Sequence, residues 1–472
     1  MWRTEVSNQT PGTPRSTREW QAADSAHFLH PFTDHQALAA KGARVITRGE
    51  GIYVWDSEGH RILDAMSGLW CVNVGYGQPA LEDAALRQMR TLPFYNAFFQ
   101  TTTPPAVMLA ERLAGIAPGF KHVFFSSSGS EANDTNIRLV RRYWDLMGQP
   151  QRQVIISRRN AYHGSTLAAA SLGGMPAMHA QGGLPIPGIV HIEQPHDWAH
   201  REGAARGLTR DDFGRLAASW LEDKILELGS ETVAAFIAEP VQGAGGVIVP
   251  ADTYWPEVQR ICERHGVLLI SDEVICGFGR TGQWWGSQTF GSRPDLMTFA
   301  KGITSGYVPL GGVMVGERVA QVLIERGGEF EHGYTYSGHP VACAVALANL
   351  DLIEQLGLVQ RVREDTGPWL ARQLATLQDH PIVGGVQSCG LMAAVQLSRE
   401  PRTGAAFDPA HAIGMVCRRH CFDHGLVMRA VGDRMIVAPP LVITREQIDE
   451  MMGLVRQALD RTWEEARASG WV

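Results

Sequence analysis

The sequence has few cysteines, no long apolar run and no cluster of like charges. Its seven cysteines are an odd number without a pairing pattern, which argues against a disulfide framework and favours a reducing compartment. No apolar run reaches the roughly 18–20 residues that a membrane-spanning helix needs, and the first residues, "MWRTEVSNQT", lack the apolar core of a secretion signal. We therefore expect a cytoplasmic protein without a membrane partner.

The charge balance gives no sign of a nucleic-acid partner. The chain carries 42 Lys and Arg against 49 Asp and Glu, and its net charge of −7 leaves no basic surface for phosphate backbones. Cys417 and Cys421 could share one helix face, but no further ligand pair lies near them, so we expect no metal site. The composition is 44% hydrophobic with 19% charged residues, which predicts an ordinary folded protein.

The length of 472 residues predicts a large domain and a smaller one. From about residue 104, short apolar segments such as "QVIIS", "AAFIAEP" and "VLLISDEV" alternate with longer helical patterns, which indicates an α/β fold with a mostly parallel central sheet. After about residue 345 the pattern is that of a smaller α+β domain. We expect an N-terminal tail over 1–30, part of the small domain over 31–80, the large domain over 81–345 and the C-terminal small domain over 346–472.

Two shorter patterns predict turns. Between residues 51 and 68, apolar and polar residues alternate around the turn "SEG" at 57–59, which predicts a hairpin. In the C-terminal part, the stretch "VGG" at 383–385 predicts a turn before a strand-like segment.

Three groups of residues that can carry chemistry each follow a predicted strand. In "FFSSSGSEAND", the turn Ser128-Gly129-Ser130 stands between a strand and a helix, where free N–H groups and hydroxyls favour an anion such as phosphate. Ser130 could equally serve only as a helix cap. Because chemistry in parallel sheets gathers at the carboxyl ends of the strands, this turn should lie near the other two groups.

Asp272 and Lys301 are the other two groups. Asp272 ends the apolar segment "GVLLISD", where a buried charge needs a partner such as an arginine, a metal or a protonated ring nitrogen. With Glu273 it could also form a metal pair or a structural salt bridge. Lys301 ends "DLMTFAK", and a desolvated lysine loses its proton readily, which suits a Schiff-base nucleophile. Taken alone, Lys301 could be a surface lysine with a packed stem.

Pyridoxal 5′-phosphate (PLP) needs these three groups together. It needs an anchor for its phosphate, an anion that keeps its ring nitrogen protonated, and an amine for its aldehyde. NAD is the alternative, because Gly277, Gly279 and Gly282 have the spacing of the dinucleotide-binding fingerprint. The residues that follow these glycines do not predict the helix that a dinucleotide site needs. The combination therefore favours PLP.

Several motifs resemble the class III aminotransferases, or ω-transaminases, which have PLP fold type I. The motifs found in the order and spacing of that family are "SGSEA", "AYHGST", "AEPVQGAGG", "SDEVICGFGRTG", "FAKGI" and "YTYSGHP". The resemblance runs from about residue 30 to the C-terminus. Its branch of pyruvate-dependent amine and diamine transaminases is similar in "GLWCVNVGYG", "PFYNAFF", "YHGSTLAAASLGGM" and "LVMRAVGDRMIVAPPL". The resemblance implies a large PLP-binding domain in an obligate homodimer, or a tetramer, with active sites at the subunit interface.

The resemblance also implies roles for residues around the cofactor ring. Lys301 would bind PLP covalently, and Asp272 would face the ring nitrogen. Tyr162 would stack on one face of the ring, although it could be plain core, and Val274 would pack against the other face.

Further matches concern the phosphate and the rim of the ring. The turn Ser128-Gly129-Ser130 would bind the phosphate together with Thr335 of the other subunit, although Thr335 could be an ordinary turn residue. His163 could support the cofactor from behind or be a satisfied polar residue. Glu239 and Gln242 resemble the family's pair at a strand end near the ring oxygen.

The substrate side rests on four residues. Arg429 looks like the mobile arginine of this branch, which would pair with the carboxylate of a keto acid; a structural salt bridge is the alternative. Trp70, Phe98 and Tyr162 would form aromatic walls for an amine without a carboxylate, and Phe98 could equally be a core or dimer contact. Many family members that act on ornithine-like substrates carry glutamine where this chain has Ile275, which argues against those substrates and against 2-oxoglutarate as acceptor.

The sequence therefore predicts a PLP-dependent transaminase. It would move an amino group from a primary amine or diamine, such as putrescine or cadaverine, to pyruvate, giving an aldehyde or ketone and L-alanine. A β-alanine–pyruvate or other ω-amino acid aminotransferase is an alternative, as is another PLP reaction on the same fold. An NAD-dependent oxidoreductase is the alternative from a different class.

Overall fold

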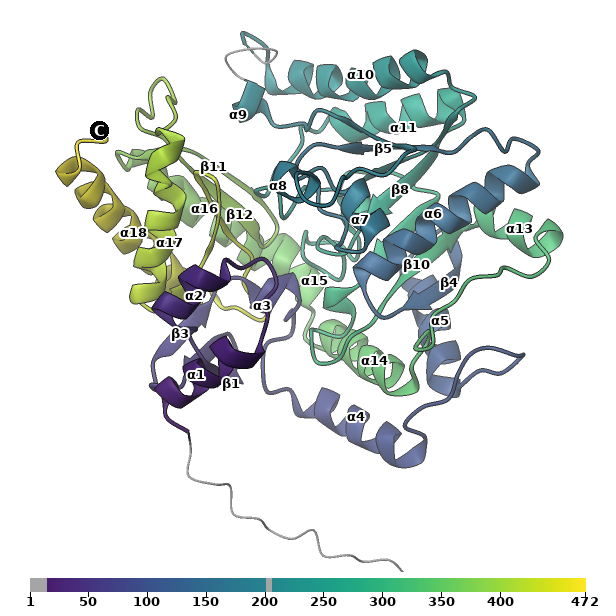
Figure 1. Cartoon of the computed structure of the whole chain (residues 1–472), viewed down its shortest axis with the longest axis horizontal. Helices are drawn as coiled ribbons and strands as arrows, with labels where there is room; N and C mark the ends of the chain where they lie inside the picture. Colours follow the sequence, from purple (N-terminus) through teal and green to yellow (C-terminus); the bar gives the residue numbers. More distant parts are fainter. Residues whose placement is uncertain (1–14, 201–205) are drawn as a thin grey trace, which may run out of the picture.

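A computed structural model describes residues 15–200 and 206–472, and its elements gather into a larger and a smaller part (Figure 1). The larger part, drawn mainly in blue, teal and green, is built on a seven-stranded sheet. The smaller part combines purple segments from early in the chain with yellow ones from its end.

The seven-stranded sheet confirms the predicted α/β fold. Its strands lie in the order β4-β10-β9-β8-β7-β5-β6, and every neighbouring pair is parallel except the two pairs that contain β10. The strand bounds are β4 Phe120–Ser126, β5 Val154–Arg158, β6 Ile189–Ile192, β7 Val233–Ala238, β8 Leu268–Asp272, β9 Leu296–Phe299 and β10 Gly311–Gly316.

Helices cover both faces of this sheet, which explains why its strands are apolar throughout. In β7, the side chains of Ala235 and Ile237 pack with α6 and α13, whereas Phe236 and Ala238 pack with α10 and α11. A strand buried on both faces has no polar side to alternate with the apolar one. The helices of the larger part are α4 Pro79–Thr91, α5 Pro104–Ile116, α6 Gly129–Leu146, α7 Leu167–Leu172, α8 Pro176–His179, α9 Asp197–His200, α10 Arg210–Leu228, α11 Tyr254–His265, α12 Gly286–Thr289, α13 Glu317–Arg326 and α14 Pro340–Gln355.

The smaller part contains two four-stranded sheets. The first has the order β1-β2-β3-β13, with β1 Ile46–Glu50, β2 Tyr53–Asp56, β3 Arg61–Asp64 and β13 Leu426–Val427. The second has the order β11-β12-β15-β14, with β11 Val383–Cys389, β12 Met392–Leu397, β14 Arg429–Val431 and β15 Arg434–Val437. Its helices are α15 Leu358–Arg361, α16 Gly367–Ala375, α17 Ile413–Asp423 and α18 Arg445–Ala468.

The first small sheet joins distant parts of the chain. Strand β2 pairs antiparallel with β3, as the hairpin at 51–68 predicts, and β3 then pairs in parallel with β13. Early residues and late residues of the chain therefore share one sheet. The division at residues 80 and 345 stays a prediction.

The expected tail over 1–30 is partly helical. Residues 1–14 lie outside the described residues, and Thr17–His27 forms α1, followed by α2 His35–Lys41. Ser16 caps α1 in a capping box, because its Oγ accepts from Glu19 N at 3.3 Å while the Glu19 carboxylate accepts from Ser16 N at 2.7 Å. Part of the expected tail, residues 17–27, is therefore a capped helix.

The turn expected at 383–385 is wrong, because these residues begin β11. A Cβ on Gly384 would lie 2.5 Å from Cη2 of Trp198, so the glycine allows the indole ring to pack directly on the strand. Glycine inside a strand often marks such a close approach rather than a turn.

No single helix within residues 15–200 and 206–472 is long and apolar enough to cross a membrane. By length and composition alone, α14 and the segment Leu358–Asp379 would together be long and apolar enough to span a membrane, but the two are bent by 52° relative to each other. Half or more of α14 is buried in the hydrophobic core, where apolar helices of this kind commonly occur.

A buried arginine connects the smaller part to the larger one. The Arg434 side chain, at the start of β15, donates to Val247 O at 3.2 Å and to Gln387 Oε1 at 2.7 Å, and it also bonds Gly246 O. Its Nη1 lies 3.2 Å from His196 Nε2, which must accept because a guanidinium only donates. Burial and the positive charge of Arg434 lower the pKa of His196 to about 3.

This contact predicts a pH-dependent stability. An unfolded histidine titrates near pH 6.5, so below that pH the unfolded chain binds a proton that the folded His196 does not. Stability should therefore fall as the pH falls, by about 2 kcal/mol between pH 7 and pH 5 from this residue. Urea unfolding at both pH values should show that His196→Gln, which keeps an acceptor for Arg434, loses most of this change. The exposed His35→Gln is the matched control, and an equal pH dependence in both variants would contradict the prediction.

Candidate active site

The carboxyl ends of β4, β5, β7, β8 and β9 meet at one edge of the large sheet, where parallel strands commonly place a site. A cavity of about 390 Å³ opens there. The predicted site residues that line it are Ser128, Gly129, Ser130, Tyr162, His163, Asp272, Val274 and Lys301. The structure therefore brings the serine turn, the acid and the lysine together, as the sequence predicts.

The serine turn is shaped by the start of α6. Ser128 is the N-cap, and its Oγ accepts from Glu131 N at 3.2 Å. Ser130 Oγ accepts from Ser165 N at 3.0 Å, which joins the turn to the loop after β5. The first turn of α6 therefore presents backbone N–H groups and hydroxyls toward the cavity, an arrangement that favours an anion.

Asp272 is buried, with 3% of its surface exposed, and receives donors from three segments. Its Oδ2 accepts from Asn133 Nδ2 at 2.9 Å and from His163 Nδ1 at 2.7 Å, and its Oδ1 accepts from Val274 N at 3.1 Å. A buried carboxylate needs such donors to replace water. Among the described residues Oδ1 accepts only the Val274 N–H, so a lone pair is left for a ligand.

Lys301 begins the 3₁₀ turn Lys301–Ile303 with a φ of +49°, in a region that residues other than glycine rarely adopt. Asn349 Nδ2 holds this turn by donating to Gly302 O and Ile303 O, both at 2.9 Å. Burial lowers the pKa of Lys301, and the charge of Arg429 lowers it further, against the opposite effect of Asp272. A larger share of its amine is therefore neutral near pH 7 than in an exposed lysine.

Glu239 follows β7 and is buried beside the cavity. Its Oε1 accepts from Tyr162 N at 3.2 Å and its Oε2 from Gly243 N at 2.8 Å. Burial raises the pKa of Glu239, and the charge of Asp272 raises it further. Gln242 donates through Nε2 to Arg159 O at 2.8 Å, behind the cavity rather than in its lining.

Besides Glu239 and Gln242, four more predicted residues lie outside this cavity. Thr335 is exposed. The ring of Phe98 packs on Gly333, which precedes Thr335 in the chain, and a Cβ on Gly333 would lie 2.8 Å from Phe98 Cζ. Trp70 is 1% exposed and packs in the core with Val241. Arg429, on β14, lines a separate cavity of about 390 Å³, although its charge reaches Lys301. The roles predicted for these residues stay predictions.

Three residues near the site were not predicted. Cys71 lines the cavity directly after Trp70, and Asn133 contacts Asp272 from one helical turn beyond Ser130. The helical spacing of Asn133 is a signal that could have found it. Phe32 has its ring centroid 6.3 Å from that of Tyr162, and nothing in the sequence around Phe32 indicates this contact.

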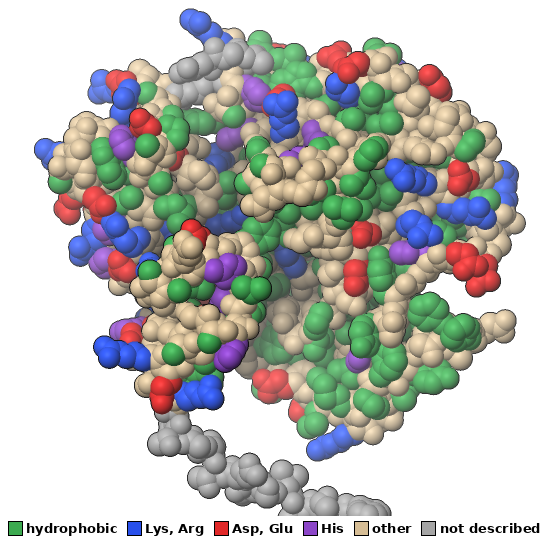
Figure 2. Space-filling view, viewed as in Figure 1, with side chains coloured by type: hydrophobic (Ala, Val, Ile, Leu, Met, Phe, Trp, Pro, Cys, Tyr) green, Lys and Arg blue, Asp and Glu red, His purple; other side chains and the backbone are tan. Residues whose placement is uncertain are grey.

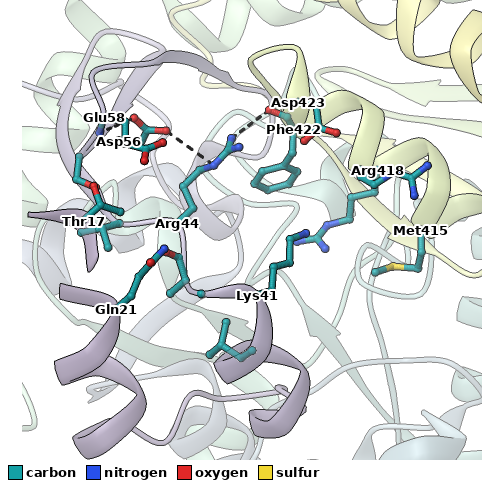
Figure 3. Close-up of a pocket in the computed structure, with 16 residues that line it drawn as sticks. Thr17, Gln21, Lys41, Arg44, Asp56, Glu58, Met415, Arg418, Phe422 and Asp423 are labelled. Atoms are coloured by element: carbon teal, nitrogen blue, oxygen red, sulfur yellow. Dashed lines mark hydrogen bonds and ion pairs between the residues drawn. The ribbon is translucent and has the colours of Figure 1, made fainter. Parts of the chain in front are cut away.

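A larger cavity, of about 650 Å³, lies in the smaller part of the molecule (Figure 3). It is lined by α1, α2, the residues around Arg44 and helix α17. Arg44 Nη1 donates there to Phe422 O at 3.0 Å, and Arg44 Nε lies 3.9 Å from Asp56 Oδ2. None of the predicted site residues lines this cavity, so size alone does not identify the active site.

Comparison with known proteins identifies the family. Residues 37–459 match the family described as Aminotransferase class-III. The chain belongs to this family. It is 57% identical over 451 residues to the putrescine–pyruvate aminotransferase of Pseudomonas aeruginosa, a match that covers 95% of this chain and 98% of that protein.

Solved structures of ω-transaminases have the same fold. The (S)-enantioselective ω-transaminase of Thermomicrobium roseum matches with a TM-score of 0.91 and 44% identity, covering 95% of this chain and all of that one. The ω-transaminase of Pseudomonas jessenii, solved in complex with PMP, matches with a TM-score of 0.91 and 41% identity, covering 94% of this chain and 98% of that one. This aminotransferase is PLP-dependent, and its fold is PLP fold type I.

The cavity fits PLP in two respects. Asp272 Oδ1 keeps a lone pair for a ring N–H, and Lys301 offers an amine of lowered pKa in the same cavity. Glycines beside the serine turn also let neighbouring residues approach it closely. A Cβ on Gly164 would lie 2.5 Å from Ser130 Oγ, and a Cβ on Gly129 would lie 3.0 Å from Val274 Cγ2.

The Gly164 contact predicts a loss of cofactor affinity. Gly164→Ala should push Ser130 away from its hydrogen bond with Ser165 N, and we expect the apparent Kd for PLP to rise at least about tenfold, the equivalent of roughly 1.4 kcal/mol. Fluorescence titration of the apoenzyme measures this Kd. Gly59→Ala is the matched control, since Gly59 also has a positive φ but nothing within 4 Å of a Cβ. Equal affinities in the two variants would show that Gly164 does not shape the phosphate site.

Proposed function

We propose that this aminotransferase moves an amino group from a primary amine or diamine, such as putrescine or cadaverine, to pyruvate, giving an aldehyde or ketone and L-alanine. The observation that carries the proposal is the 57% identity over 95% of the chain to a putrescine–pyruvate aminotransferase. The placement of Ile275 in the cavity wall, where ornithine-type members carry glutamine, supports an apolar pocket for donors without a carboxylate.

We propose that PLP is held by residues from each strand end. The ring nitrogen would face Asp272, the covalent bond would form at Lys301, and His163 and Val274 would support the ring from behind. Tyr162 would cover its outer face, and Glu239 would bind near the ring oxygen. The phosphate would be bound by Ser128, Gly129 and Ser130, with Thr335 of the partner subunit.

The chain's own residues then provide orientation and proton transfer. When bound, PLP supplies an aldehyde that takes up amino groups and a ring that withdraws negative charge from the substrate carbon. Asp272, as an anion, keeps the ring nitrogen protonated, which strengthens this withdrawal. Lys301 Nζ would act as the base that removes the proton from the amine-bearing carbon, and its lowered pKa favours the neutral amine.

Arg429 is proposed to recognise pyruvate. Its guanidinium stays charged near neutral pH, although burial lowers its pKa, and its planar fork suits two parallel bonds to a carboxylate. An amine donor has no carboxylate to pair with this cation, and the distal ammonium group of a diamine would be repelled by it, so Arg429 would turn away when the donor binds. Trp70 and Phe98 would complete the aromatic walls of the donor pocket.

The two half-reactions test the role of Arg429. Arg429→Ala should reduce kcat/KM for pyruvate at least about a hundredfold, roughly 2.7 kcal/mol, and should change the half-reaction with putrescine by less than about threefold. Stopped-flow absorbance of the bound cofactor measures each half separately. Lys301→Ala is the control that should abolish both half-reactions, and equal losses of both with Arg429→Ala would indicate a structural role.

A panel of diamines, monoamines and β-alanine identifies the donor class. Each donor is incubated with pyruvate, and the alanine that forms is measured.

A homodimer is proposed from an exposed apolar surface. Figure 2 shows hydrophobic side chains gathered at the lower right, over the region of α4. Phe94 contacts Tyr336 there with ring centroids 5.6 Å apart, close to Thr335. The exposed apolar residues of α4, α5 and the segments near them are Leu86, Met89, Phe94, Tyr95, Phe98, Phe99, Val107, Met108 and Tyr336. Patches of this kind commonly form protein interfaces, and this one would place Thr335 and Phe98 at a partner's cavity.

Phe99 gives the test of this interface. Its side chain is 89% exposed, so Phe99→Glu should leave the subunit folded while weakening the dimer, and we expect sedimentation velocity to show monomers at low micromolar concentration. Activity should fall in parallel and recover with rising protein concentration. Leu226→Glu on α10, 64% exposed, is the matched control. A wild-type protein that is monomeric and active would contradict the proposal.

We also propose that the protein works in the cytoplasm. All seven cysteines are free in the structure, including Cys417 and Cys421, which lie one turn apart on α17. This agrees with a reducing compartment.

A further inference from the structure

Three buried polar side chains form a network behind Asp272. Asn133 and Asn136 lie on α6, Thr298 lies on β9, and each is 0% exposed. Thr298 Oγ1 lies 2.7 Å from Asn133 Oδ1 and 2.6 Å from Asn136 Nδ2. Asn133 Nδ2 in turn lies 2.9 Å from Asp272 Oδ2. The network thus leads from the core of the sheet to the carboxylate.

The contacts of Asn133 fix the direction in which its amide faces. Its Nδ2 meets two acceptors, Asp272 Oδ2 and His163 O, the latter at 2.8 Å. Its Oδ1 meets two donors, Thr298 Oγ1 and Asn136 Nδ2, the latter at 3.1 Å. A reversed amide would place its oxygen against a carboxylate and a carbonyl and its Nδ2 against Asn136 Nδ2, and would lose at least three of the four hydrogen bonds.

The hydroxyl of Thr298 decides whether this orientation is held. A hydroxyl has one proton, and because Asn136 Nδ2 donates to Thr298 Oγ1, the Thr298 proton is available for Asn133 Oδ1. The donors therefore run in one direction, from Asn136 to Thr298, from Thr298 to Asn133, and from Asn133 to Asp272. Each step of this path joins a donor to an acceptor, and the one atom of the three side chains without a hydrogen-bond partner among the described residues is Asn136 Oδ1, at the end farthest from Asp272.

Asp272 depends on the network for its position. His163 and Val274 supply the other donors to its carboxylate, but both belong to loops, whereas Asn133 belongs to an 18-residue helix. Loss of the Asn133 N–H would leave a buried charge with two donors and allow the carboxylate to rotate. The lone pair of Oδ1 that faces the cavity would then no longer be fixed.

We propose that Thr298 and Asn136 are positioning residues that act through Asn133 to hold the Asp272 carboxylate against the cofactor's ring nitrogen. This inference rests on the proposed role of Asp272. Neither Thr298 nor Asn136 lines the cavity, so their effect on the cofactor passes through the amide of Asn133.

The test uses Thr298→Val in the holoenzyme, because valine keeps the shape of threonine and removes only the hydroxyl. We expect the apparent Kd for PLP to rise about tenfold, the equivalent of roughly 1.4 kcal/mol. The pH midpoint of the visible absorbance of the bound cofactor should also move, since it reports the charge at the ring. Thr298→Ser keeps the hydroxyl and should restore both values.

Thr462→Val on α18 is the matched control. Thr462 is also 0% exposed, and its hydroxyl donates to Ala458 O at 2.6 Å within its own helix, far along the chain from the site. Loss of this buried hydroxyl should leave the cofactor affinity and the absorbance midpoint unchanged. If Thr462→Val shifts both values as much as Thr298→Val does, the effect is one of general stability and the proposal fails.

A double-mutant cycle tests the path through Asn133. In an Asn133→Leu background, Thr298→Val should change the PLP affinity by less than about twofold, because the amide on which it acts is gone. A full tenfold effect in that background would overturn the proposal. Asp272→Asn separates this inference from the proposed function: if it leaves the affinity and the absorbance midpoint unchanged, the role of Asp272 itself fails. If Asp272→Asn changes both and Thr298→Val changes neither, only the network inference fails.

Discussion

A carboxylate buried at the end of an apolar strand needs hydrogen-bond donors from several directions, and Asp272 obtains them from separate elements of the fold. Asn133 comes from α6, His163 from the loop after β5 and Val274 from the loop after β8. Each donor must be in place for the charge to remain buried. The packing of α6 on the sheet and the course of both loops are therefore tied to one carboxylate.

The same edge of the sheet also carries strain at Lys301. Its positive φ is held by Asn349, which donates to the carbonyls of the two residues after Lys301.

A second buried charge lies in the loop after β8. Arg280 is 0% exposed, and its guanidinium donates to Leu391 O, Ser67 Oγ and Asn73 Oδ1. These contacts attach the loop after β8 to the smaller part of the molecule. The glycine-rich stretch that resembles a dinucleotide site thus contributes a connection between the two parts, and α12, which follows it, has only four residues.

The sequence predicts those features that depend on neighbours along the chain. The strand before Asp272, the serine turn at the start of α6 and the hairpin around residues 57–59 each have a local pattern of apolar and turn residues. The capping box of α1 is local too, since Ser16 and Glu19 are three residues apart, and such a pattern can be recognised in the sequence.

Features that depend on distant contacts could not be predicted in this way. Thr298 lies 165 residues from Asn133, and no periodicity connects them. Gly384 lies in a strand and leaves space for the ring of Trp198, a contact that only the folded chain reveals. Thr335 and Phe98 do not line the cavity of their own chain, so the roles proposed for them would require a second copy of the chain.

Strand β10, the one antiparallel member of the large sheet, separates the strand that ends in the serine turn from the strand that ends in Lys301. It has almost no side chains where it does so, because a Cβ on Gly311 would lie 2.7 Å from the backbone of Ser128. Two inter-strand steps amount to about 10 Å. The strand order therefore sets the distance between the serine turn and Lys301. A molecule that binds both must match this distance, which is determined by the backbone and not by side chains.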